Sequence, residues 1–149
     1  MMTEFTVSLF GHRRIDDLRA LDAQLIPIIR ELLRTKPFVD FLIGRNGEFD
    51  EYAASLIKHV QKEHENESSS LTLVLPYKVA GIEFYEKYYD GIYIDENASR
   101  AHPKAAIKKK NRRMIERSDL VIVYAKEKGG AYAAMRYAEK LKKPILRLT

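Results

Sequence analysis

The chain contains 149 residues, with 26 Lys plus Arg, 21 Asp plus Glu and no cysteine. This length predicts one domain over residues 1–149, and 46% apolar with 32% charged residues is typical of globular proteins. The lack of cysteine excludes disulfides, thiolate metal sites, iron–sulfur clusters and a cysteine nucleophile. No apolar run approaches the ~20 residues of a membrane span, and the N-terminus lacks a signal-peptide layout. We therefore expect a cytoplasmic protein that has no membrane partner.

The net charge of +5 is concentrated in one segment. Between Arg100 and Arg117 there are eight basic residues and one acidic residue, so this segment carries +7 and the rest of the chain −2. The basic character is therefore a local feature, and it needs a local explanation.

The first half of the chain alternates strand and helix patterns. Phe5–Phe10 is a β-rich run closed by glycine, and an apolar stripe follows on a helix from about Asp16 to Thr35. Phe38–Ile43 predicts a second strand and Phe49 to about Glu65 a second helix. The polar stretch His64–Ser70 predicts a short loop.

The same alternation continues through the middle of the chain. Leu71–Leu75 predicts a third strand, which Pro76 ends. The tyrosine-rich region Tyr77–Tyr93 predicts a short helix near Glu83–Tyr89 and a short strand at Ile92–Ile94. This region is suited either to a lid over a cleft or to a dimer contact, and the sequence does not decide between them.

The last third completes the pattern. A helix from about Lys104 to Arg117 carries the basic cluster, and Asp119–Tyr124 is the most strand-like run of the chain. A helix over Ala131–Lys142 and a strand over Pro144–Leu148 follow. Alternating strands and helices with near-continuous apolar strands predict an α/β fold, a Rossmann-like three-layer sandwich with a mostly parallel sheet.

Three predicted strands end in glycine-containing turns that lead into helices. In an open parallel sheet, ligands bind beyond the carboxyl ends of the strands, where glycine lets backbone amides approach an anion. None of the turns fits G-x-G-x-x-G or the P-loop pattern, which disfavours a standard dinucleotide fold and a P-loop NTPase. The candidate ligand-binding residues at these turns are Gly11, His12, Arg13, Gly44, Arg45, Asn46, Gly47, Gly129, Gly130 and Tyr132, joined by Asn111 from the basic helix.

Several of these side chains also have a purely structural interpretation. Arg13 is suited to a bidentate phosphate contact, but equally to an ion pair at the helix start, with His12 capping a backbone carbonyl. Glu48 and Asp50 are the candidate catalytic carboxylates, acting on sugar hydroxyls or as an acid–base group, whereas spacing alone favours Asp50 as a helix N-cap.

The histidines and carboxylates do not form a metal-binding pattern. No pair of histidines has the i, i+4 spacing of a zinc protease, and no G-x-S-x-G elbow exists. We therefore expect no metal and no resident cofactor. For the basic helix, the run Lys108–Lys110 together with Arg112 and Arg113 is suited to a nucleic-acid backbone. A solvated outer face is the favoured interpretation, so a nucleic-acid partner is not expected.

Several short motifs, in order and over almost the whole chain, resemble the SLOG superfamily in its YpsA-related branch. They are Phe10–Arg13, Gly44–Asp50, His102–Lys104, Asn111–Met114, Arg117–Asp119, Gly129–Ala131 and Tyr137–Ala138. The resemblance implies a Rossmann-like fold that binds a nucleotide or nucleotide-derived ligand near the first, second and last glycine turns.

The LOG enzymes of that superfamily are phosphoribohydrolases with the pattern P-G-G-x-G-T-x-x-E, whose Glu assists glycosidic cleavage. Here Ala134 or Arg136 stands at the Glu position, depending on the register. Losing a placed acid or base costs on the order of 10²–10⁴-fold in rate. The sequence thus favours a nucleotide-binding or nucleotide-sensing module. A homo-oligomer is compatible with this interpretation. The alternatives are an N-glycosidase that uses Glu48 or Asp50, and nucleic-acid binding through residues 104–117.

Overall fold

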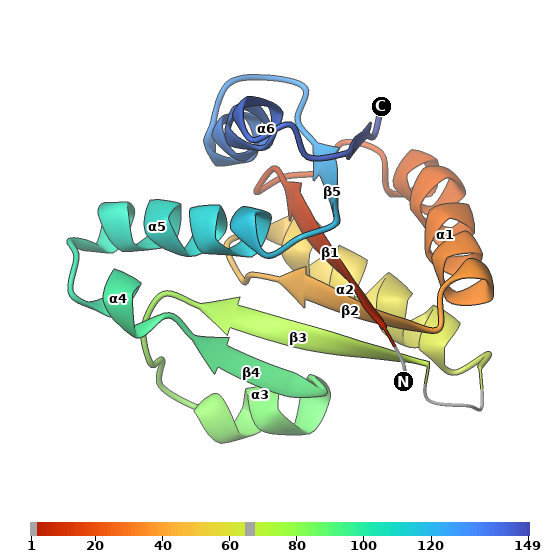
Figure 1. Ribbon diagram of the computed structural model, residues 1–149, viewed down its shortest axis with the longest axis horizontal. Helices are drawn as coiled ribbons and strands as arrows, with labels where there is room; N and C mark the ends of the chain where they lie inside the picture. The colour runs from red at the N-terminus through yellow and green to blue at the C-terminus, as the bar shows by residue number, and fades with distance from the viewer. Residues whose placement is uncertain (1–2, 65–67) are drawn as a thin grey trace.

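The structure is a computed structural model that describes residues 3–64 and 68–149. Its centre is a six-stranded sheet in the order β4-β3-β2-β1-β5-β6, and every neighbouring pair of strands is parallel (Figure 1). The strands are β1 (Glu4–Gly11), β2 (Phe38–Ile43), β3 (Ser69–Leu75), β4 (Gly91–Ile94), β5 (Leu120–Tyr124) and β6 (Ile145–Arg147). The predicted Rossmann-like α/β fold with a parallel sheet is confirmed.

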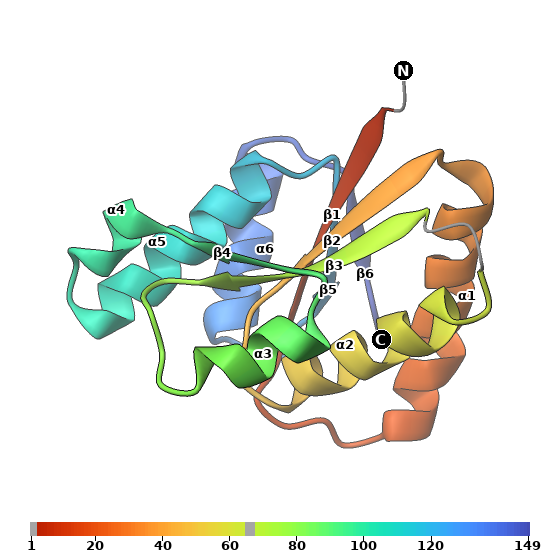
Figure 2. The same ribbon diagram turned by 90° about the horizontal axis from the view of Figure 1, so that it is seen from below.

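Helices cover both faces of this sheet. They are α1 (Leu18–Thr35), α2 (Glu48–Gln61), α3 (Ile82–Tyr88), α4 (Glu96–Ser99), α5 (Pro103–Glu116) and α6 (Gly130–Lys140). Figure 2 shows the sheet between α5 and α6 on one side and α1, α2 and α3 on the other. None of the helices in the described ranges is long and apolar enough to cross a membrane.

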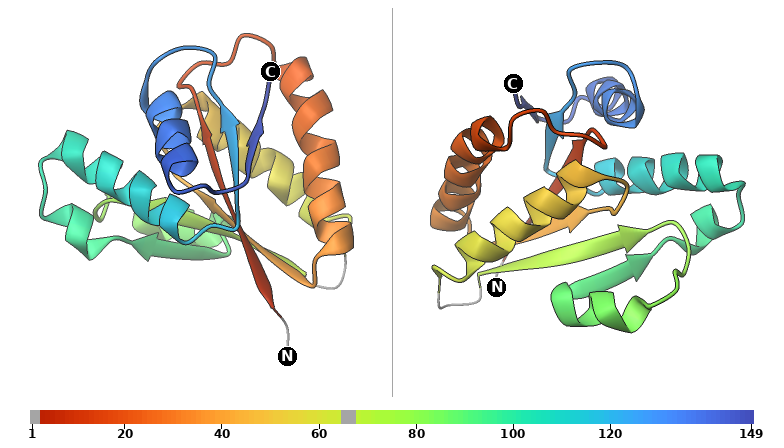
Figure 3. Two further views of the ribbon diagram at one scale, coloured as in Figure 1. Left: turned by 45° about the horizontal axis from the view of Figure 1, so that its top comes forward. Right: turned by 180° about the vertical axis from the view of Figure 1, so that it is seen from behind.

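The alternation of side chains along each strand builds two separate cores. On β1, Val7 and Leu9 join the core under α1 and α2, while Phe10 joins the core under α5 and α6. All five residues of β5 are buried, as expected for a strand covered on both faces. The view from behind in Figure 3 shows α2 lying across its face of the sheet.

The predicted element boundaries differ from the structure at a few places. The second helix ends at Gln61 rather than near Glu65, and residue 65 lies outside the described residues, as does part of the predicted loop His64–Ser70. The short helix α4 was not predicted. Its start is capped by Asp95, whose carboxylate accepts the backbone N–H groups of Asn97 and Ala98.

The strand order places a topological switch point beside β1. The chain builds β1 to β4 outward in one direction and then crosses to β5 on the other side of β1. The register pairs Gly11 at the end of β1 with Tyr124 at the end of β5. The loops that follow these two strands leave in opposite directions, which opens a crevice at this edge of the sheet.

Candidate functional site

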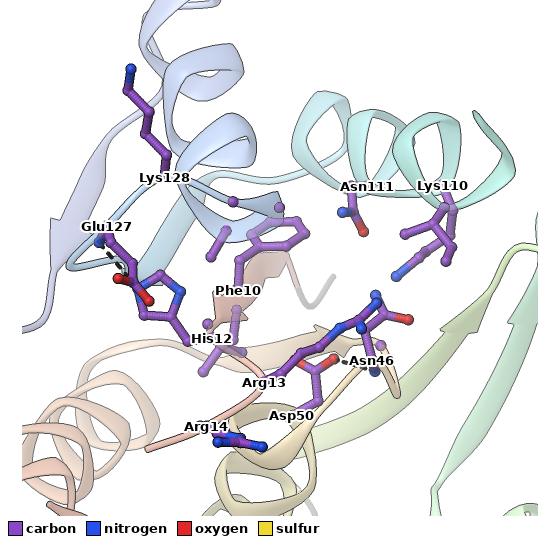
Figure 4. A pocket seen from close by; sticks show the side chains of 17 residues that line it. Phe10, His12, Arg13, Arg14, Asn46, Asp50, Lys110, Asn111, Glu127 and Lys128 are labelled. Atoms are coloured by element: carbon purple, nitrogen blue, oxygen red, sulfur yellow. Dashed lines mark hydrogen bonds between the residues drawn. The ribbon is translucent and has the colours of Figure 1, made fainter. Parts of the chain in front are cut away.

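A cavity of about 530 Å³ lies at the switch point, above the carboxyl ends of β1, β2 and β5. Nine of the thirteen residues predicted for the site line it. Figure 4 shows the side chains of His12, Arg13, Asn46, Asp50 and Asn111 around this cavity. The nine are Gly11, His12, Arg13, Gly44, Asn46, Asp50, Asn111, Gly129 and Gly130. The remaining four, Arg45, Gly47, Glu48 and Tyr132, do not line it.

The loop after β1 is tied to the loop after β5 by His12. The His12 Nε2 atom accepts the backbone N–H of Lys126 at 2.7 Å and that of Glu127 at 3.3 Å. An Nε2 that accepts carries no proton, so the ring proton resides on Nδ1. Capping of a backbone carbonyl by His12, one of the two interpretations that the sequence allows, is not what the structure shows at Nε2. This atom is an acceptor for two amides that position the entrance to α6.

The backbone amides at the start of α2 and in the turn before it already have hydrogen-bond partners within the protein. The amides of Glu48 and Phe49 donate to the carbonyl oxygens of Arg13 and His12, and the amide of Asn46 donates to Asp50 Oδ2 at 2.8 Å. The N-cap is Gly47, so Asp50 lies at the third helical position rather than at the N-cap that its spacing had favoured. Three of the amides at the second glycine turn therefore have partners before any ligand arrives.

Close packing explains the glycines of the first two turns. A Cβ on Gly11 would lie 2.0 Å from the ring of Phe49, and one on Gly47 would lie 2.5 Å from the Cα of Arg13. At Gly44 it would lie 2.6 Å from Lys110 Nζ and 3.3 Å from Asp50 Oδ2. These three glycines leave room for a ring, for a backbone and for an ammonium group, respectively.

The third glycine turn is different because it is open. A Cβ on Gly129 or Gly130 would meet no atom within 4 Å, and Gly129 has φ +156°. The first amide of α6 with a carbonyl partner is that of Ala133, which donates to Gly129, and no side chain caps the helix. In the described chain, the amides of Gly130, Ala131 and Tyr132 have no acceptor. Helix starts whose amides lack partners are positions that favour anions in general.

The buried Lys110 faces the same cavity. In the sequence it is one of three consecutive lysines and was not predicted as a site residue. Lys110 is 1% exposed, and Figure 4 shows it pointing from α5 toward Asp50 and Asn46. It has no hydrogen bond or ion pair among residues 3–64 and 68–149. Burial lowers the pKa of Lys110 to about 8, opposed by the nearby charge of Asp50. The signal in the sequence is the four-residue spacing of Ala106, Lys110 and Met114, all buried on one face of α5.

Asp50 and Asn111 complete the polar lining. Burial raises the pKa of the Asp50 carboxyl, while the amide of Asn46 and the charge of Lys110 oppose the increase. The side-chain oxygen of Asn111 is buried and has no hydrogen-bond partner in the described residues. A buried acceptor without a donor is costly, and a bound donor group would satisfy it.

The predicted site residues outside the cavity have structural contacts of their own. The Arg45 guanidinium lies 5.5 Å from the centre of the Tyr85 ring, and Glu48 Oε1 accepts the backbone N–H of Ile15. Tyr132 packs against the core under α6. No residue of the Tyr77–Tyr93 region lines the cavity. Across the described ranges, no three His, Asp or Glu side chains gather in a way that could hold a metal ion.

Comparison with solved structures identifies proteins of similar fold. One is DNA processing protein A from Helicobacter pylori, described for its single-stranded DNA binding mode, with a TM-score of 0.64 and 21% identity. The match covers 96% of this chain and 64% of that one, so the chain spans slightly less than two thirds of its length. The other is the molybdenum cofactor carrier protein from Chlamydomonas reinhardtii, with a TM-score of 0.61, 14% identity and coverage of 97% and 76%.

Comparison at the level of sequence gives no further relatives. No protein-family model matches the chain, and no curated protein sequence matches it. At these identities the structural likeness concerns the arrangement of the backbone. The chain therefore has the Rossmann-like fold that is found in both of these proteins.

Proposed function

We propose that the cavity binds a small molecule that bears a phosphate group, with a nucleotide or nucleotide-derived molecule as the expected class. The observation that carries the proposal is that two groups suited to an anion line the same cavity. They are the free amides at the start of α6 and the ammonium of Lys110, which has no partner among the described residues. Both groups favour a ligand that bears a phosphate.

The rest of the lining supports the same ligand class. Arg13 and Arg14 are exposed at the mouth of the cavity and suit a phosphate or diphosphate. The unpaired oxygen of Asn111 suits a donor such as an exocyclic amine. The structurally similar proteins are described as binding single-stranded DNA and carrying the molybdenum cofactor, which supports ligand binding by this fold. We further propose membership of the SLOG superfamily, on the motifs given above.

Isothermal titration calorimetry with a panel of nucleosides, nucleoside mono- and diphosphates and inorganic phosphate tests the proposal. Lys110→Met removes the buried charge, and Lys109→Met is its matched control because Lys109 is exposed and does not line the cavity. We expect Lys110→Met to weaken phosphate-bearing ligands by about 10–100-fold, the value of a charge-assisted hydrogen bond. Lys109→Met should leave the affinity unchanged. Absence of binding by every panel member, or equal losses in both variants, contradicts the proposal.

A second candidate is cleavage of an N-glycosidic bond, favoured by the position of Asp50. Its carboxyl lies in the cavity with a raised pKa, which suits a general acid that protonates a leaving base. Glu48, the other candidate, is exposed and outside the cavity. We expect Asp50→Asn to lower base release by on the order of 10²–10⁴-fold while nucleotide binding persists, and Glu48→Gln to retain turnover. Chromatography of the released base measures the rate of turnover. If Asp50→Asn turns over as fast as the wild type, cleavage of an N-glycosidic bond by Asp50 is excluded.

A further inference from the structure

A second hollow of about 540 Å³ lies between α5 and α6, and its charge is one-sided. Five basic side chains line it, and none of its lining residues is acidic. The five are Lys104, Lys108 and Arg112 from α5 with Arg136 and Lys140 from α6. We call this hollow the α5–α6 groove. Five cations facing one groove repel one another in the free protein, so an anionic occupant would relieve the repulsion.

Most of these charges are available to a ligand. Within the described residues only Arg136 makes an ion pair, with Glu139 at 3.3 Å. The Arg112 guanidinium lies 4.7 Å from the centre of the Tyr137 ring, whose hydroxyl donates to Glu116 at 2.6 Å. Lys104, Lys108 and Lys140 have no hydrogen-bond or ion-pair partner in the ranges that the structure describes.

The groove is also lined by apolar side chains. They are Ile107 and Ile115 from α5 with Ala133, Ala134 and Tyr137 from α6. Positively charged grooves with an aromatic ring such as Tyr137 suit a single strand, because the cations attract phosphates and a base stacks on the ring. A basic helix face that only contacts solvent would not need apolar side chains beside its charges, so this groove differs from the solvated face that the sequence favours.

The spacing of the cations along α5 is regular. Lys104, Lys108 and Arg112 follow one another at steps of four residues, so they lie on one side of the helix about 6 Å apart. This is on the order of the separation between successive phosphates in an extended single strand. Lys109 and Lys110 are not part of this row, because Lys110 is buried in the cavity and Lys109 lies outside the groove.

The groove is continuous with the cavity. Ile107, Asn111, Gly129 and Gly130 line both hollows, so the open start of α6 forms the passage between them. A ligand with one phosphate at the α6 amides would therefore have its next phosphates directed along the row of cations on α5.

We propose that the cavity and the α5–α6 groove together bind a short single strand of nucleic acid, with its terminal phosphate in the cavity and the following two or three nucleotides in the groove. This inference rests on the proposed phosphate-binding function of the cavity. Of the three consecutive lysines Lys108, Lys109 and Lys110, the inference assigns contact with the strand in the groove to Lys108.

Titrations with oligonucleotides of increasing length test the inference. We measure affinities for 5′-phosphorylated thymidine oligomers of one to six nucleotides, the matching uridine oligomers and a poly-glutamate peptide. Affinity should rise over the first three or four nucleotides and then stay level, because the groove is then filled. The DNA and RNA series show which sugar the groove prefers.

Lys108→Glu and Lys109→Glu form a matched pair, since both are exposed neighbours on α5 and both change the net charge equally. Lys108→Glu should weaken a tetranucleotide roughly fivefold to tenfold at low salt, with a shallower salt dependence. Lys109→Glu should have less than a twofold effect, and both variants should bind the mononucleotide as the wild type does. Circular dichroism and thermal melts verify that both variants are folded.

The outcomes separate the two proposals. If the mononucleotide binds and longer strands bind no tighter, the groove is not a strand-binding site while the cavity proposal stands. If a tetranucleotide binds and the mononucleotide does not, the cavity is not the anchor and both proposals fail as stated. Equal loss in Lys108→Glu and Lys109→Glu, or tighter binding of poly-glutamate than of any oligonucleotide, also overturns the inference.

Discussion

At the scale of single residues, Lys110 is the most unusual group in the molecule. It is 1% exposed, lines the cavity and has no hydrogen-bond or ion-pair partner among residues 3–64 and 68–149, and a buried ammonium in that state is costly to the fold. Asn111, the next residue, shows the same feature in a neutral side chain, because its buried oxygen has no donor in the part of the chain that the structure describes. Both of these unsatisfied polar groups lie on α5 and line the same side of the cavity.

Lys110 makes a prediction about stability and pH. Its pKa falls from the usual 10.5 to about 8 in the folded protein, so between these values the unfolded chain binds more protons and stability attributable to Lys110 rises with pH. Lys110→Met should therefore be more stable than the wild type at pH 7, by on the order of 1–3 kcal/mol in the free energy of unfolding. The difference should shrink toward pH 10. Urea unfolding of both proteins at the two pH values measures it.

A destabilised Lys110→Met at pH 7 would show that the folded protein favours the ammonium, contrary to this account. Lys109→Met controls for the loss of one positive charge at the surface, and its stability should show no comparable dependence on pH. Asp50 is the charged group that faces Lys110 from α2, so Asp50→Asn should lower the pKa of Lys110 further.

At the scale of elements, the glycine turns separate into close-packed and open ones. Gly11 allows the Phe49 ring, which is fully buried, to lie directly against the end of β1. Gly130 begins α6 with open space around it. The two positions look alike in the sequence, because each is a glycine after a buried strand, and only the packing tells them apart.

Alanine substitutions at these two glycines should have opposite consequences. Gly11→Ala places a methyl group inside the Phe49 ring and should destabilise the fold by about 3 kcal/mol, as overpacking does. Gly130→Ala meets no atom and should leave the melting temperature within a few degrees of the wild type, while it weakens phosphate binding by crowding the α6 amides. Thermal melts with and without nucleotide measure both effects. Equal melting temperatures for the two variants would contradict the distinction.

At the scale of the whole molecule, the cavity depends on contacts between the two halves of the sheet. The loop after β1 reaches α2 on one side through its carbonyl groups, and on the other side His12 holds the loop that leads into α6. The site is therefore assembled by segments more than a hundred residues apart in the sequence.

Removing the His12 contact should loosen the entrance to α6 without unfolding the protein. His12→Ala removes an acceptor from two amides and should cost about 1 kcal/mol in stability, with faster hydrogen exchange at Lys126 and Glu127 and weaker nucleotide binding. His12→Gln retains an acceptor oxygen and should restore part of the protection. Unchanged exchange at these two amides in His12→Ala would contradict the bridging role.

The sequence by itself determined the order and type of every strand and of every helix except the short α4. Apolar strands such as Leu120–Tyr124 and amphipathic helices such as Leu18–Thr35 are local patterns, and alternating them permits essentially one architecture, so the parallel sheet was predictable. The glycine turns after β1, β2 and β5 likewise pointed to one edge of the sheet, because parallel strands bring their carboxyl ends together.

Only the tertiary structure decided which of those residues are free to act. Whether an amide already has a carbonyl partner, as at the start of α2, or lacks one, as at the start of α6, depends on loops that are distant in the sequence. The basic segment shows the same limit. Lys108, Lys109 and Lys110 are indistinguishable as a run of charge, yet a rotation of about 100° per residue sends one into the groove, one to solvent and one into the cavity.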